Sequence, residues 1–175
     1  MIDYDALYAG IYDIVQPLID PIPLMIEFQN ETPSARVYAV YRIIRSEQVG
    51  QPQWGEPDVN GVSTITHVYN LTIRFQMIGQ GSQGALSDLH AKLTRPSVID
   101  AFSDLDLDFY DRGMIRDVPR LKPVGYEARG MFEMQYYIKV VDTDDTGYFN
   151  SVTVETTIKD QADVVKLVRT DTYAV

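Results

Sequence analysis

Two long stretches of the chain alternate between apolar and polar residues. In residues 65–79 one face carries Ile65, Tyr69, Leu71, Ile73, Phe75 and Met77, and only His67 interrupts it. In residues 126–140 one face carries Phe132, Met134, Tyr136, Ile138 and Val140, and the other is mainly polar. A period of two residues is typical of a half-buried β-strand, so the pattern predicts two long strands.

The predicted strands are long for a chain of this size. Fifteen residues extend roughly 50 Å, whereas a compact domain of 175 residues should be about 40 Å across, from its expected radius of gyration. We therefore interpret the strands as arms that contact other subunits, which favours an assembly protein over an enzyme. Gly130, within the second strand, is expected to mark a bulge or bend.

The first residues predict an amphipathic helix over residues 3–19, capped by Asp3 or Asp5 and ended by Pro17, Pro21 and Pro23. Its apolar positions recur at helical spacing, and Tyr4, Tyr8 and Tyr12 form a second row beside them. The combined apolar arc of about 160° is wider than one sheet requires. The extra width is expected to face a neighbouring subunit or to fill a deep groove in the same domain.

The remaining pattern completes an α+β fold. We expect strands at residues 24–28, 36–45 and 148–158, the last turning back from the second long strand, and a half-buried edge strand or a turn at 104–111. A helical region is expected at 85–102, broken or kinked at Pro96. The predicted fold class is an antiparallel sheet with long hairpins, covered on one face by two helices. Residues 1–158 are expected to form a single domain, and residues 159–175 a C-terminal tail.

Composition narrows the possible functions. The net charge of −10 and the pI of about 4.5 argue against a dedicated nucleic-acid binder, which needs Lys and Arg to neutralise phosphates. The absence of cysteine removes disulfides and thiolate chemistry. No apolar run approaches the roughly 20 residues of a membrane span, and no signal peptide is evident. We therefore expect a soluble protein made in the cytoplasm.

A glycine motif offers the sharpest alternative. Gly79, Gly81 and Gly84 match the G-x-G-x-x-G pattern that holds a dinucleotide pyrophosphate at the start of a helix. However, the preceding strand alternates with Thr72, Arg74 and Gln76, whereas a parallel Rossmann strand is buried on both faces. A glycine-rich turn between an antiparallel strand and its helix is the preferred interpretation, and a nucleotide-binding enzyme is the rival.

The sequence gives little support for a metal-binding or catalytic site elsewhere in the chain. The aspartates at 142–147 lack the spacing and the closing Glu of a calcium loop, and those at 104–111 are expected to face water. His67 and His90 lack partners at ligand spacing, so each is expected to be an interior or interface residue. No hydrolase, zinc-protease or Walker motif occurs. We predict no catalytic residue, cofactor or metal site.

The long segment at residues 47–63 is a candidate contact loop. It carries Gln51, Pro52 and the only tryptophan, Trp54, and its Asn60-Gly61 pair predicts an organised turn. Trp54 either packs on its own domain or anchors a protein contact, because tryptophan is enriched at interface hot spots. Arg116 and Asp117 are expected to pair locally or, as a second possibility, across subunits.

Short segments in order along the chain carry a resemblance to a known family. They are Val40-Tyr41, Gln51-Pro52, Tyr69, Leu71-Thr72-Ile73, Phe75-Gln76, Gly79, Ile115-Arg116-Asp117-Val118-Pro119, Tyr126-Glu127-Ala128-Arg129, Phe132-Glu133 and Gly147-Tyr148. Together they resemble the neck or tail terminator proteins of tailed bacteriophages, over residues 36–150.

The resemblance implies a structural subunit, not an enzyme, that forms a ring, usually a hexamer, in the virion. Such a ring caps the head-proximal end of the tail tube and docks the head connector, while DNA passes through without specific binding. Within this class a head-completion protein, a connector adaptor or a tail-tube subunit is the alternative, and outside it an adhesin presenting Trp54. The predicted interface residues are Gln51, Pro52, Trp54, Ile65, His67, Tyr69, Arg116, Asp117, Tyr126, Arg129 and Phe132.

Overall fold

The computed structural model of the protein describes residues 2–27, 36–121, 123, 125–145, 151–159 and 165–174, the last two ranges as backbone only. Contacts divide the chain into two units. The first comprises residues 1–53 and 66–142, and the second comprises residues 54–65 and 143–175. The helices and nearly all of the buried core belong to the first unit.

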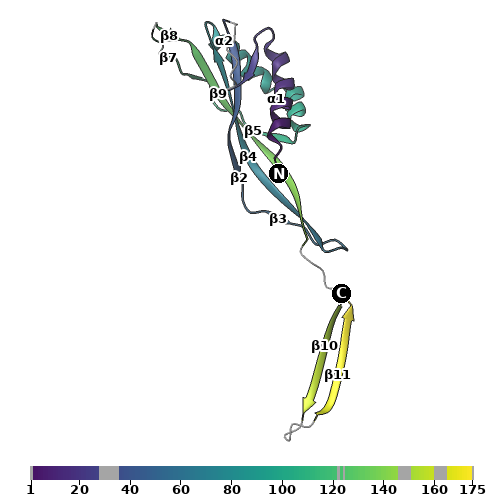
Figure 1. Ribbon diagram of the computed structural model, residues 1–175. Helices are drawn as coiled ribbons and strands as arrows, with labels where there is room; N and C mark the ends of the chain where they lie inside the picture. The colour runs from purple at the N-terminus through teal and green to yellow at the C-terminus, as the bar shows by residue number, and fades with distance from the viewer. Residues whose placement is uncertain are drawn as a thin grey trace. The chain divides into compact units, whose positions relative to one another are not determined.

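A mixed β-sheet forms the centre of the fold (Figure 1). Its strand order is β1-β2-β4-β9-β5, with bounds β1 (Leu24–Ile26), β2 (Tyr38–Gln48), β4 (Val62–Ile78), β9 (Arg129–Asp145) and β5 (Leu107–Asp111). Two short strands, β3 (Gln53–Trp54) and β6 (Arg116–Asp117), pair with β4 and β9. The pairs β2–β4 and β5–β9 are antiparallel, whereas β1 runs parallel to β2.

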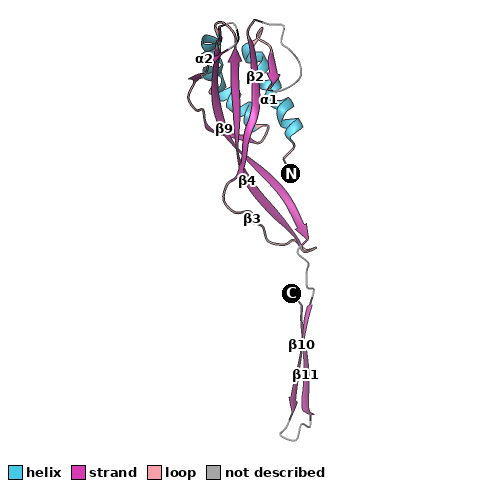
Figure 2. Cartoon of the chain, turned by 60° about the vertical axis from the view of Figure 1, so that its left-hand side comes forward, coloured by secondary structure: helices cyan, strands magenta, loops and turns pink. Residues whose placement is uncertain are grey.

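Helices α1 (Tyr4–Ile19), α2 (Ser82–Leu93) and α3 (Pro96–Ser103) lie on one face of this sheet (Figure 2). Pro96 occupies the first turn of α3, where its missing N–H costs nothing, so the predicted break at this residue is confirmed. The α+β class is also confirmed, with two helices in place of one kinked helix after β4.

Helix α1 begins and ends as predicted. The Asp3 carboxylate accepts a hydrogen bond from the Ala6 N–H at 3.0 Å and caps the helix. The helix ends at Ile19, ahead of Pro21 and Pro23, whereas Pro17, the first of the three prolines expected to end it, lies inside α1. Because proline has no N–H, Pro17 donates no hydrogen bond to the carbonyl of Asp13, an exposed residue.

The core lies between the helices and the sheet. The odd-numbered positions of β4 from Leu71 to Met77 and the even-numbered positions of β9 from Phe132 to Ile138 are buried under the helices. Aromatic rings pack both within the sheet and between the layers. The centroids of Phe75 in β4 and Phe132 in β9 lie 5.3 Å apart, and those of Phe102 in α3 and Tyr136 in β9 lie 4.9 Å apart. The alternation in the sequence therefore identifies the buried face of both strands correctly.

The two long strands span 17 residues each. Burial changes along them: residues 71–78 of β4 are buried except Arg74, whereas residues 64–70 are half-buried or exposed, and so are residues 139–145 of β9. One end of each strand therefore builds the core and the other end leaves it. Gly130, where a bulge or bend was expected, pairs in register with Asp117 of β6, and a Cβ there would meet the Leu86 side chain of α2.

The C-terminal pairing differs from the prediction. Strand β10 (Ser151–Lys159) pairs antiparallel with β11 (Val165–Ala174), with Val152 opposite Tyr173. The expected hairpin between the second long strand and residues 148–158 is therefore wrong, and its predicted turn includes residues 146 and 147, which lie outside the described ones. A period-two pattern identifies a strand but carries no information about its partner.

Candidate assembly interfaces

The sheet face opposite the helices is polar and internally paired. Asn70 donates to the Gln135 side chain at 3.3 Å, and Arg129 donates to that of Gln76 at 3.3 Å. Between them Arg74 places Nε and Nη2 at 3.1 and 3.0 Å from Glu133 Oε1.

These pairs run in opposite order along β4 and β9, so the two strands are antiparallel. The pairs fix the register between these two strands. On this face Thr72 and Gln76 are buried, whereas Arg74 and Glu133 are partly exposed.

Three predicted interface residues follow one another on β4. Ile65, His67 and Tyr69 are all half-buried, and the rings of His67 and Tyr69 stack with centroids 6.3 Å apart. The His67 Nδ1 atom is buried and makes no hydrogen bond within the described part of the chain. These side chains lie where β4 leaves the core, so the structure leaves them partly available for contact.

Phe132 and Arg129, both predicted as interface residues, are less accessible to a partner protein than that prediction implies. Phe132 is only 1% exposed and packs between Phe75 and the edge of the His90 ring. Arg129 is held by Gln76 and by an ion pair of 3.6 Å with Glu127. Phe132 therefore belongs to the core and is left out of the contact set proposed below, whereas Arg129 keeps a partly exposed guanidinium.

Arg116 and Asp117 form strand β6 beside β9, and both side chains are exposed. No ion pair joins the two residues within the described part of the chain. The predicted local pairing is therefore not found. Both charges face solvent next to a small groove that Arg116 shares with Met114 and Met131.

A short hairpin beyond β6 exposes large apolar side chains. Strands β7 (Arg120–Leu121) and β8 (Tyr126–Glu127) pair antiparallel, with Leu121 directly opposite Tyr126. Leu121 is 69% exposed and Tyr126 is 76% exposed. Tyr126 was predicted as an interface residue; Leu121 was missed, and its only signal in the sequence is an apolar residue between Arg120 and Lys122.

The contact loop is ordered at its tip. The Asp58 carboxylate accepts hydrogen bonds from the N–H groups of Asn60 at 2.8 Å and Val62 at 2.9 Å, which hold its pKa below the ordinary value. Gly61 adopts a φ of 80° in the turn, so the prediction of an organised Asn60-Gly61 turn is confirmed. An ordered tip can present a contact surface without a large ordering cost.

The apolar side chains of this loop face water. Trp54 is 61% exposed and Val59, at the tip, is 87% exposed, while Gln51 is exposed and Pro52 half-buried. The alternative in which Trp54 packs on its own domain therefore receives little support from its exposure. Trp54 and Val59 are available to a partner.

The glycine motif forms a structural turn. Gly79 has a φ of 115° and donates its N–H to the Ala128 carbonyl at 2.9 Å, and Gly81 caps α2 with a φ of 84°. Strand β4, which leads into the turn, is antiparallel to its neighbour β2. A dinucleotide fold requires parallel strands around this turn, so the geometry favours the structural interpretation.

The His90 side chain makes contacts within the fold. The His90 Nε2 atom lies 3.1 Å from the Arg112 carbonyl oxygen, and the ring meets Phe132 edge-on at 4.8 Å. No group of three or more His, Asp or Glu side chains in the described residues is arranged to hold a metal ion. Among those residues, no helix is both long and apolar enough to cross a membrane.

A second groove, which the sequence did not reveal, lies between α1 and β1. It measures about 490 Å³ and is lined by Tyr8 and Tyr12 of α1, by Met25 and Ile26 of β1, and by Asp5 and Asp13. The tyrosine row on α1 was visible as an unusually wide apolar arc. The groove itself could not be predicted from the sequence, because it depends on how β1 docks beside α1.

These features define an α+β subunit whose exposed apolar side chains lie on ordered turns and grooves. A family model described as phage neck terminator protein matches residues 5–165. The chain therefore belongs to the phage neck terminator proteins, a family of structural virion components. No curated protein matches the chain in a sequence comparison.

Proposed function

We propose that this protein forms a closed ring, a hexamer by the usual family stoichiometry, at the head-proximal end of the phage tail. The ring ends polymerisation of the tail tube and joins the tail to the head connector. Membership of the neck terminator family over most of the chain carries the proposal. Synthesis in the cytoplasm of the host and incorporation into the virion neck are part of it.

Two groups of residues would make the contacts. Lateral contacts between subunits would use Ile65, His67, Tyr69, Arg116, Asp117, Tyr126 and Arg129. Axial contact with a tail-tube or head-completion protein would use Gln51, Pro52 and Trp54. The exposure of Trp54 and Tyr126 supports this division, because aromatic side chains on ordered turns are typical anchors of protein interfaces.

The acidic character of the subunit suits a DNA conduit. With a net charge of −10, the chain would repel phosphates in a ring lumen and limit adhesion of the passing genome. A lumen lined mainly by Lys and Arg in the assembled ring would contradict this part of the proposal.

Electron microscopy and native mass spectrometry of the purified full chain test the proposal. We expect closed rings of one stoichiometry, and we expect their addition to polymerising tail-tube protein to stop tube growth. Long tubes formed by the chain alone would identify a tail-tube subunit instead. A chain that stays monomeric and leaves tube length unchanged would overturn the proposal.

A further inference from the structure

Strand β1 lies at one end of the central sheet. It comes first in the strand order, and β2 is its only strand neighbour among the described residues. The Ala39 N–H of β2 donates to the Pro23 carbonyl at 2.9 Å. Backbone groups of successive residues alternate in direction along a strand, so the Ile22 carbonyl and the Leu24 N–H point away from β2. Another strand could add to the sheet at these two groups.

The side chain of Gln16 in α1 occupies this position. Its Nε2 donates to the Ile22 carbonyl at 3.1 Å, and its Oε1 accepts from the Leu24 N–H at 2.8 Å. One residue of a parallel neighbouring strand would use the same two groups, because it bonds to the residues just before and just after its counterpart. The Gln16 carboxamide therefore takes the place of one residue of an added strand.

Helix α1 holds this carboxamide in place. Val15 is 0% exposed and Ile19 is 6% exposed, so the residues around Gln16 on the helix are anchored in the core. Gln16 itself is half-buried. The two hydrogen bonds are thus made by a side chain on a packed helix, which fixes its position better than a loop would.

The two ends of the sheet are protected differently. Strand β5 is the last in the order, and its Asp108 and Asp111 side chains are exposed. Charged side chains on an edge strand oppose the addition of another strand. Strand β1 consists of Leu24, Met25 and Ile26 and carries no charge. Its protection must therefore come from outside the strand.

We propose that Gln16 is an edge cap, which keeps a second copy of this chain from adding a strand to β1. An uncharged edge strand with free backbone groups is a template for pairing with another chain, and in a solution of this protein the available chain is a second copy. None of the residues proposed above for lateral contacts belongs to β1. The cap goes beyond the proposed ring and does not depend on it.

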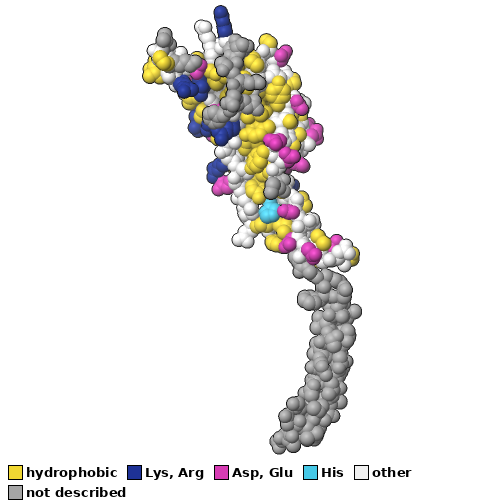
Figure 3. Space-filling model, viewed as in Figure 1, with side chains coloured by type: hydrophobic (Ala, Val, Ile, Leu, Met, Phe, Trp, Pro, Cys, Tyr) yellow, Lys and Arg dark blue, Asp and Glu magenta, His cyan; other side chains and the backbone are white. Residues whose placement is uncertain are grey.

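Charge beside β1 acts in the same direction. Figure 3 shows Asp and Glu side chains along the side of α1, and Asp13 and Asp20 are exposed there. Copies that each carry a net charge of −10 repel one another. Salt screens this repulsion, so association at an uncapped β1 should be strongest at high salt.

Sedimentation of the full chain tests the cap. Gln16→Leu removes the donor and the acceptor and keeps a good helix former of similar size. The parent chain should keep the same species over a wide range of concentrations. Gln16→Leu should add larger species that increase with protein concentration and with salt.

Tyr41→Phe is the matched control for sedimentation. It removes the hydrogen bond of 2.7 Å from the Tyr41 hydroxyl to the Tyr8 carbonyl of α1. The contact between α1 and the sheet is weakened, as in Gln16→Leu, but no group of an edge strand is uncovered. This variant should therefore sediment like the parent chain.

Hydrogen exchange follows the Leu24 N–H itself. Pro21 and Pro23 have no N–H, so short peptides across this segment report few other amides. In dilute Gln16→Leu, exchange at Leu24 should be about tenfold faster than in the parent, because one hydrogen bond is lost. In the larger species it should slow again, because an added strand bonds to this N–H.

The outcomes decide the inference separately from the ring. Folded Gln16→Leu that sediments like the parent at every concentration and salt overturns the cap, and so does equal growth of Tyr41→Phe. If Gln16→Leu does not fold, the parent decides: a protected Leu24 amide supports the cap, and exchange at the rate of a free amide overturns it. A parent chain that stays monomeric overturns the proposed ring, while the same comparison of variants still decides the cap.

Discussion

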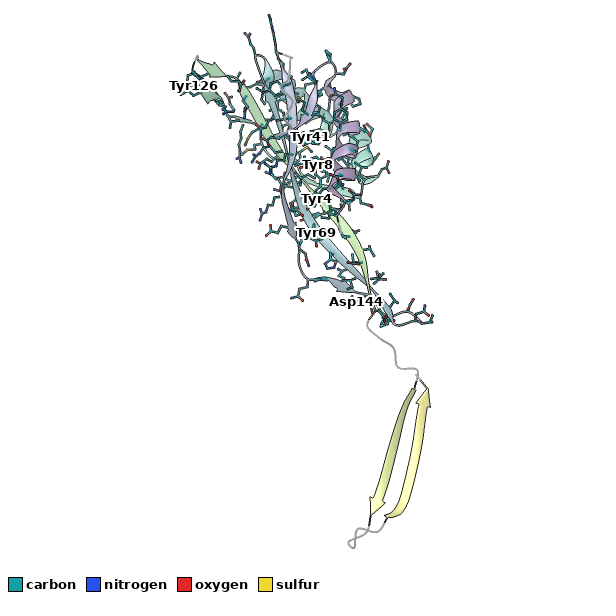
Figure 4. The ribbon with its side chains drawn as sticks, in the orientation of Figure 1. Tyr4, Tyr8, Tyr41, Tyr69, Tyr126 and Asp144 are labelled. Carbon is teal, nitrogen blue, oxygen red and sulfur yellow. The ribbon has the colours of Figure 1, made fainter. Side chains whose placement is uncertain are left out.

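Tyr41 and Tyr8 connect the central sheet to the first helix through two hydrogen bonds. The Tyr41 hydroxyl donates to the Tyr8 carbonyl at 2.7 Å, and the Tyr8 hydroxyl accepts from the Ile43 N–H at 3.1 Å. Their rings lie 5.8 Å apart, and both residues line the groove between α1 and β1 (Figure 4). The position of α1 on the sheet therefore depends on polar as well as apolar contacts.

The variant Tyr41→Phe should lower the free energy of unfolding by about 1 kcal/mol, because it removes one intramolecular hydrogen bond and keeps the ring. Urea denaturation followed by circular dichroism measures the change. Tyr4→Phe is the matched control: Tyr4 lies in the same row on α1 but is exposed, so its stability should match that of the parent chain. Equal stability of Tyr41→Phe and Tyr4→Phe would show that the Tyr41 bond contributes nothing.

Two glycines of the same motif should respond oppositely to alanine. At Gly79 a Cβ would overlap the Arg36 carbonyl oxygen, and φ is 115°, so Gly79→Ala should destabilise the fold by several kcal/mol, about 3 or more. At Gly84, inside α2, a Cβ meets open space, so Gly84→Ala should raise stability by about 0.5–1 kcal/mol. Thermal unfolding compares the two variants, and a neutral Gly79→Ala would contradict the observed turn.

Alkaline pH should reveal two tyrosines that ionise late. Burial raises the pKa of Tyr41 and of Tyr136 above the ordinary value of 10.0. The folded chain therefore keeps protons that the unfolded chain releases above pH 10, so the free energy of unfolding should fall as pH rises from there. Below pH 10 this contribution is fully present.

An ultraviolet titration of phenolate measures this directly. Tyr41 and Tyr136 should ionise together with unfolding. Tyr136→Phe should reduce the phenolate signal that accompanies unfolding, at little cost in stability, because within the described part of the chain its hydroxyl bonds to the Met134 sulfur at 3.6 Å, a weak acceptor. Alkaline unfolding that releases no phenolate signal would refute the assignment.

Removal of Trp54 should affect assembly and leave the fold intact. Because the side chain is largely exposed, Trp54→Ala should unfold at the same temperature as the parent chain. In cells infected with phage that lack a functional copy of the gene, the variant should yield unjoined heads and tails by electron microscopy. Tyr110→Ala, another exposed aromatic, is the control and should support joining. Normal virions with Trp54→Ala would show that the loop is not an anchor.

Local patterns in the sequence predicted the elements well. The capped start of α1, the buried faces of the two long strands, the break at Pro96 and the Asn60-Gly61 turn were all visible, because each depends on residues close in the chain. The error over β10 arose where distant residues decide, because this strand pairs with β11 instead of with β9. Pro17 lies inside α1, although the helix ends at Ile19 as its pattern predicts.

For the candidate interface too, local patterns were predicted correctly and features that depend on distant residues were not. Trp54 could be predicted as an aromatic residue of a loop and Tyr126 as the first residue of a long strand, and both are exposed. Phe132, predicted in the same strand as Tyr126, lies in the core between Phe75 and His90. Leu121 and the groove between α1 and β1 were missed, because exposure and concavity are properties of packed surfaces.

The sequence by itself determined the α+β class, the faces of the long strands, the acidic charge and the family, since periodicity, composition and short motifs are written along the chain. Only the tertiary structure decided that β1 lies parallel beside β2, that a groove opens between β1 and α1, and that the β7–β8 hairpin leaves Leu121 and Tyr126 in water. The physical reason is that pairing, burial and shape arise from contacts between residues far apart in the chain, which a local pattern does not specify.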